Sequence, residues 1–96
     1  MKVALYVDDL MFGSRVRELL AACGHEVVFG ADDEADAAFV DLTHQWVDKP
    51  AMPALAVFGH TSPQTRERAL AAGYEVVVPR SRFVREPGEL IARLSP

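Results

Sequence analysis

The sequence predicts one α/β domain built on a parallel sheet. Five short apolar runs alternate with polar or helix-forming segments along the 96 residues. Continuous apolar runs of this length are typical of strands that are buried on both faces. Strands that alternate with helices or loops indicate parallel pairing through right-handed crossovers. The length suits a single core, so residues 1–96 are expected to form one domain.

Each predicted strand is an apolar run that ends at a polar residue, a glycine or a proline. The five runs are Lys2–Val7, His25–Phe29, Ala37–Asp41, Ala54–Phe58 and Glu75–Val78. A helix is predicted over residues 11–23, because apolar side chains recur there at helical spacing and Gly24 follows as a C-cap. Residues 31–36 are acidic and leave room for a turn or two of helix at most.

The second half of the chain continues the alternation. Residues 43–53 contain two prolines and show no helical period, which indicates a loop. Thr61 or Ser62 can cap the next helix, which ends before Gly73. A last short helix is predicted over residues 87–94, where a proline opens the segment.

This element order predicts a three-layer, flavodoxin-like α/β arrangement with strand order 2-1-3-4-5. In that arrangement the second, third and fourth helices cover one face of the sheet. Here the second and third are shortened or missing, so that face is expected to be thinly covered over strands two, one and three. A bare apolar face usually marks an interface. We therefore expect a homodimer, or a protein partner, at this face.

Composition narrows the classes of function. The formal net charge of −4 argues against general binding of nucleic acid or of a membrane surface. Cys23 is the one cysteine, which excludes an internal disulfide, and its place on the apolar side of the first helix predicts a core position. No segment approaches the roughly 20 apolar residues of a membrane span, and the first residues do not form a signal peptide. A cytoplasmic, reducing setting is expected.

Acidic residues end two of the predicted strands. Asp8 and Asp9 follow the first strand, and Asp41 ends the third. The carboxyl ends of parallel strands meet at one rim of a sheet, so these three carboxylates are expected to lie close enough to hold Mg²⁺. His44 and His60 follow strands three and four and could bind a transition metal together with Asp41, although surface histidines are commoner.

The strand ends carry a resemblance, over the whole chain, to the receiver domain of bacterial response regulators. The matching segments are Val7-Asp8-Asp9, Val40-Asp41-Leu42 and Ala71-Ala72-Gly73. The resemblance implies that Asp8 and Asp9 hold Mg²⁺ and that Asp41 accepts a phosphoryl group. A carboxylate can attack phosphorus when a metal ion offsets the charge that gathers there.

The chain departs from the family where the family contacts phosphate. Phe58 stands at the end of strand four in place of a hydroxyl residue, and Arg80-Ser81 replaces the Lys-Pro that follows strand five. An arginine is a planar fork. Arg80 could therefore pair with Asp41 or Asp8 and lock the site without phosphate. The first loop is one residue shorter than in the family, which leaves the register of the acid pair open.

These departures favour a pseudo-receiver: a stand-alone signalling or interaction module that acts by protein contact, without phosphotransfer and without enzymatic activity. One alternative is a phospho-accepting single-domain response regulator with Asp41 as the acceptor. Another is a small-ligand or metal binder that uses the same rim, although no general base or cofactor loop stands out. Trp46 lies in a polar loop and either anchors a contact or covers the sheet face. Residues 80–85 are expected to be a solvated basic edge.

Overall fold

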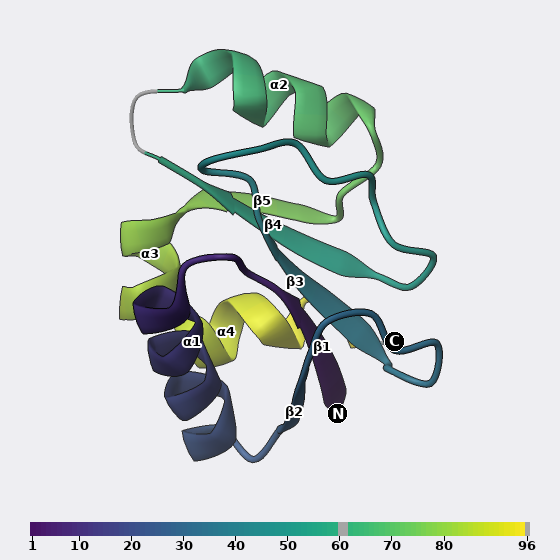
Figure 1. Ribbon diagram of the computed structural model, residues 1–96, viewed down its shortest axis with the longest axis vertical. Helices are drawn as coiled ribbons and strands as arrows, with labels where there is room; N and C mark the ends of the chain where they lie inside the picture. The colour runs from purple at the N-terminus through teal and green to yellow at the C-terminus, as the bar shows by residue number, and fades with distance from the viewer. Residues whose placement is uncertain (60–61, 96) are drawn as a thin grey trace.

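The computed structural model describes residues 1–59 and 62–95. Within them the predicted fold is confirmed: five parallel strands form one sheet in the order β2-β1-β3-β4-β5, with helices on both sides (Figure 1). The strands are β1 (Lys2–Tyr6), β2 (Glu26–Phe29), β3 (Ala37–Asp41), β4 (Ala54–Phe58) and β5 (Val76–Pro79). The predicted bounds differ from these by at most one residue at either end, because each strand is a continuous apolar run.

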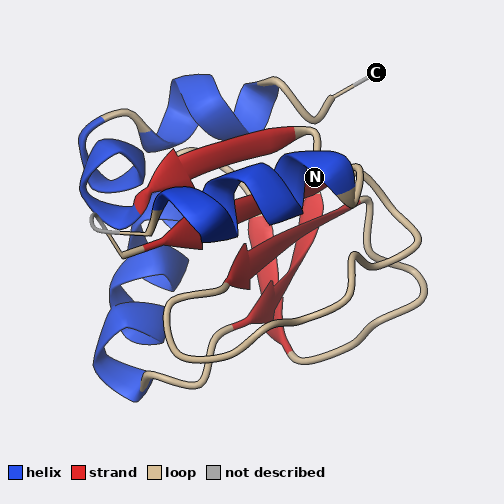
Figure 2. Cartoon of the chain, turned by 90° about the horizontal axis from the view of Figure 1, so that it is seen from above, coloured by secondary structure: helices blue, strands red, loops and turns tan. Residues whose placement is uncertain are grey.

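Four helices lie in the described residues. They are α1 (Leu10–Ala22), α2 (Pro63–Ala71), α3 (Arg80–Arg85) and α4 (Pro87–Ala92). The connections before and after β3, residues 30–36 and 42–53, contain no helix and run as loops (Figure 2). The prediction that the second and third helices of the flavodoxin-like pattern are missing is therefore confirmed. None of the helices in the described residues is long and apolar enough to cross a membrane.

The structure corrects three local predictions. Residues 80–85 form α3 where a solvated basic edge is predicted. This helix has no side-chain cap and is stabilised by burial of Phe83, whose ring packs edge-on against Phe39 with centroids 4.7 Å apart. Cys23 is exposed, because it follows the last turn of α1 instead of facing the core. Ser62 takes the N-cap position of α2 without a capping hydrogen bond, and Thr61 lies outside the described residues.

The sheet separates two hydrophobic cores of different character. The larger core lies under α1, α3 and α4 and contains bulky side chains such as Phe39 and Phe83. The smaller core lies under α2 and is rich in alanine: Ala38, Ala54, Ala56 and Ala69 are all fully buried. Small side chains on this face allow a loop to lie directly on the sheet, where a helix would need more space.

Residues 42–53, which we call the covering loop, pack on part of the sheet face that is predicted to be bare, over β3 and the end of β1, and extend over β4. Trp46, Val47 and Met52 pack on the smaller core from this loop. The Arg68 guanidinium lies 3.8 Å from the centre of the Trp46 ring, and the Trp46 ring meets Tyr74 edge-on. Of the two roles predicted for Trp46, the structure thus shows the covering one, and the interface role stays a prediction.

Tyr74 fastens the covering loop to the base of β5, and its removal should weaken the fold. Its hydroxyl donates a 2.7 Å hydrogen bond to the Val47 carbonyl, so Tyr74→Phe should cost about 1 kcal/mol of unfolding free energy. Burial raises the pKa of Tyr74 to about 12. The folded state therefore holds the phenolic proton more tightly than the unfolded chain, and stability should fall as the pH rises from about 10 toward 12.

Urea denaturation followed by fluorescence of Trp46, the one tryptophan of the chain, measures both effects. The alkaline decline should be smaller in Tyr74→Phe than in the wild type, and Tyr6→Phe should keep the decline. An equal decline in Tyr74→Phe and wild type would show that Tyr74 does not cause it.

Candidate functional site

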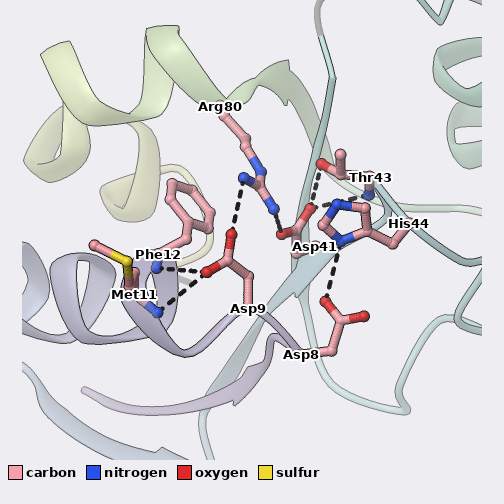
Figure 3. A network of polar contacts seen from close by, with 8 residues as sticks. All are labelled: Asp8, Asp9, Met11, Phe12, Asp41, Thr43, His44 and Arg80. Atoms are coloured by element: carbon pink, nitrogen blue, oxygen red, sulfur yellow. Dashed lines mark hydrogen bonds and ion pairs between the residues drawn. The ribbon is translucent and has the colours of Figure 1, made fainter.

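The acidic residues singled out by the sequence lie at the carboxyl ends of β1 and β3. Parallel pairing aligns Tyr6 with Val40 across these two strands. Asp41, the last residue of β3, therefore lies next to the loop that carries Asp8 and Asp9 into α1 (Figure 3). The strand register thus places the three acids at one rim of the sheet, as the sequence predicts.

Asp41 is the one buried charged residue in the part of the chain that the structure describes, and its side chain has no exposed surface. Both carboxylate oxygens have partners. Oδ1 accepts hydrogen bonds from the Thr43 backbone N–H at 3.0 Å and from the Thr43 hydroxyl at 2.6 Å. Oδ2 accepts a close hydrogen bond from the Arg80 guanidinium. A buried carboxylate needs such partners, because an unpaired charge in the interior is very costly.

Arg80 connects three separate parts of the rim (Figure 3). It is the first residue of α3, and its Nη2 donates to Asp41 while its Nη1 lies 3.5 Å from Asp9 Oδ2. The guanidinium also stacks on Phe12, with 4.1 Å between its central carbon and the ring centre. The predicted pairing with Asp41 is present, but the second acid is Asp9 and not Asp8. The fork is divided between two carboxylates instead of binding one of them bidentately.

Asp8 and Asp9 have different roles in this arrangement. Asp9 is the N-cap of α1: its Oδ1 accepts hydrogen bonds from the backbone N–H groups of Met11 and Phe12, each at 3.1 Å. The hydrogen bond from Phe12, helped by the nearby charge of Arg80, holds the pKa of Asp9 below its usual range. Asp8 is half-exposed and lies 3.5 Å from Nδ1 of His44.

Known structures superpose on nearly the whole chain. A response regulator receiver domain protein from Clostridium thermocellum gives a TM-score of 0.79 at 14% identity, covering 97% of this chain and 92% of the other. A LuxR-family DNA-binding response regulator from Staphylococcus aureus gives 0.76 at 15% identity, with 99% and 98% covered. The non-phosphorylated HemR receiver domain from Leptospira biflexa gives 0.71 at 17% identity, with 99% and 97% covered.

The fold is the receiver fold. No protein-family model matches the chain, and no curated protein sequence matches it either. Similarity at these low identities establishes the topology, while the chemistry depends on the side chains at the rim. In this chain Asp8, Asp9 and Asp41 lie at the rim formed by the carboxyl ends of the strands. Phe58, a buried apolar residue, ends β4 at the same rim.

The rim does not fit the Mg²⁺ ion that the receiver fold implies. Among the residues that the structure describes, no group of three His, Cys, Asp or Glu side chains is gathered to hold a metal ion. One oxygen of Asp9 is used in the helix cap, and both oxygens of Asp41 are held by Thr43 and Arg80. The predicted site of His44, His60 and Asp41 includes a residue outside the described ranges, and His44 contacts Asp8.

A cavity of about 220 Å³ opens beside this rim. Its lining residues are Tyr6, Val7, Asp8, Asp41, Gln45 and Val47. The space is large enough for a few water molecules or a small ligand. Binding of a small ligand at the rim stays a prediction.

Sequence reasoning misses two members of the site. Thr43 stands two residues after Asp41, and an aspartate in this position often forms hydrogen bonds with the backbone and side chain that follow. That local pattern could have identified Thr43. Phe12 is recognisable only as an apolar helix residue, because its stacking partner Arg80 is 68 positions away along the chain.

The lowered pKa of Asp9 makes the stability of this rim depend on pH. A carboxylate whose folded-state pKa lies below its unfolded value adds stability that is complete above the unfolded pKa and is lost as the pH falls through the folded one. In Asp9→Asn the amide oxygen can still cap α1, but the charge is gone. The variant should be less stable than wild type at neutral pH, and the difference should shrink between about pH 5 and pH 2.

Urea denaturation across this pH range tests the prediction. Ser14→Ala, an exposed and non-titrating change on the same helix, serves as the control and should follow the wild-type acid profile. A difference between Asp9→Asn and wild type that stays constant with pH would contradict the assigned role of the Asp9 charge.

Proposed function

We propose that this chain is a receiver-fold signalling module that acts by protein contact and is not switched by phosphorylation. The state of Asp41 supports this most directly: its side chain is fully buried and both of its oxygens are bonded. A carboxylate must present a free oxygen in order to attack phosphorus. Here Thr43 holds one oxygen and Arg80 holds the other. The proposal assigns no catalytic residue.

Opening the site for phosphorylation would be expensive. Removing Arg80 from Asp41 leaves a buried charge without its partner, which typically costs about 3–5 kcal/mol. The guanidinium would also lose its contacts with Asp9 and Phe12. Phosphoryl transfer further requires positive charge around the transferred group, and here the Arg80 charge is already paired with Asp41. In addition, Phe58 offers no hydroxyl at the end of β4 to contact a phosphoryl group. These features support a closed rim.

Intact-mass spectrometry after incubation with Mg²⁺ and acetyl phosphate tests the proposal. Under conditions that label an ordinary receiver domain, we expect no phosphoryl adduct on the wild-type protein. A single adduct that disappears in Asp41→Asn and persists in Asp33→Asn, an exposed acid in the turn after β2, would contradict the proposal. It would establish the alternative, a phospho-accepting response regulator with Asp41 as the acceptor.

We further infer that the protein contact joins two copies of the chain, through the start of α1. Leu10 and Met11 are 83% and 86% exposed there, and Phe29 at the end of β2 is 55% exposed. An alanine at position 13, one helical turn after Leu10, would bring its Cβ to 3.4 Å from the Phe29 ring. The Phe29 ring therefore lies beside the first turns of α1. Three exposed apolar side chains on these adjoining elements support a contact here in place of the sheet face.

Sedimentation equilibrium tests the dimer. The wild-type protein should associate with rising concentration, and the double variant Leu10→Glu with Met11→Glu should stay monomeric. Acidic residues suit the first turn of a helix, so the variant should fold normally. Leu70→Lys, which removes an exposed leucine near the end of α2, is the matched control and should still associate. A wild-type protein that is monomeric at all concentrations would contradict the inference.

A further inference from the structure

We infer that Arg80 is a built-in cation that takes the place of a divalent metal ion between Asp9 and Asp41. The inference deepens the proposed function and rests on it. A metal ion at such a rim joins carboxylates from different strand ends and balances their charge. The Arg80 guanidinium does both: one terminal nitrogen contacts Asp41 at the end of β3, and the other contacts Asp9 before α1 (Figure 3).

The charges at the rim show why a cation is needed there. Asp9 and Asp41 face the same guanidinium, and Asp41 is completely withdrawn from water. Within the described residues, Arg80 is the single cation that pairs with either of them. The other lysine and arginine ion pairs of this part of the chain join Lys2 to Asp32, Lys49 to Glu75, Arg82 to Glu86 and Arg93 to Glu89. Without Arg80 the two carboxylates would lack a protein counter-charge.

The position of Arg80 is determined by more than its two carboxylates. The side chain starts at the first residue of α3, a helix anchored by the fully buried Phe83. Its flat face rests on Phe12. Its Nε is buried without a hydrogen-bond partner in the described structure, so the orientation of the fork comes from the terminal nitrogens and the aromatic contact. An arginine stays charged at every physiological pH and does not dissociate as a metal ion does.

Removing the arginine should therefore uncover a metal site. In Arg80→Ala the truncated side chain leaves space between Asp9 and Asp41, and Mg²⁺ keeps several of its own water ligands when it binds to one or two carboxylates. A ligand that binds only the folded state raises its stability by mass action. The unfolding temperature of Arg80→Ala should thus rise with the Mg²⁺ concentration, and that of the wild type should not.

The experiment compares thermal unfolding by circular dichroism in EDTA and in millimolar Mg²⁺. We expect the unfolding temperature of the wild type to be the same in EDTA and in Mg²⁺. The same should hold for Arg82→Ala, which removes a matched arginine of the same helix. Arg80→Ala should unfold several degrees lower in EDTA and recover in Mg²⁺. Sodium chloride at equal ionic strength should not restore it, which separates a bound ion from general screening. In Arg80→Ala with Asp41→Asn the Mg²⁺ effect should vanish.

A folded Arg80→Ala whose unfolding temperature does not respond to Mg²⁺ would overturn the inference. A Mg²⁺-dependent rise in the wild type as large as in Arg80→Ala would show that Arg80 does not occupy the metal position. If Arg80→Ala is unfolded in EDTA, Mg²⁺ should refold it. The inference would be overturned if Mg²⁺ fails to refold Arg80→Ala under conditions in which the double variant, Arg80→Ala with Asp41→Asn, is folded. A phosphoryl adduct on wild type without a Mg²⁺ shift overturns only the proposed function. A Mg²⁺ shift in wild type without an adduct overturns only this inference.

Discussion

The buried charge of Asp41 is the constraint around which the rim at the carboxyl ends of the strands is organised. A carboxylate withdrawn from water must be matched by donors and by a positive charge. Thr43 supplies two donors from the next turn of the chain, and Arg80 supplies the charge from the carboxyl end of the edge strand β5. Arg80 in turn is shared with Asp9, which begins α1, and lies on Phe12. The two ion pairs of Arg80 thus join β3, α1 and α3.

The two faces of the sheet carry side chains of different size and are therefore covered by different elements. On one face bulky residues such as Phe39 require helices at a normal distance, and the short α3 exists because Phe83 fills the space beside that ring. On the other face alanines let the covering loop lie close to the strands, with Trp46 as its largest contact. The loss of two helices from the usual layer is therefore compensated by a change in side-chain size on the sheet beneath.

The receiver fold in this chain is a scaffold whose chemistry is decided by a few side chains. Solved receiver structures superpose on this chain at 14–17% identity, because a fold of this kind follows from apolar runs and right-handed crossovers and not from the identity of rim residues. An arginine at position 80, with an acid on each side of its fork, closes a rim that would otherwise be open and strongly negative. The proposed independence from phosphorylation rests on this closure.

By itself the sequence determined the strands, the first helix, the absence of helices around β3 and the placement of Asp8, Asp9 and Asp41 at one rim. These features depend on side-chain periodicity between near neighbours and on the rule that parallel strands end together. Only the tertiary structure decided that α3 forms, that the covering loop packs on the second face over β3 and β4, and that Arg80 pairs with Asp9 instead of Asp8. The physical reason is distance along the chain: Arg80 is 39 residues from Asp41 and 71 from Asp9, so its partners depend on how the elements pack.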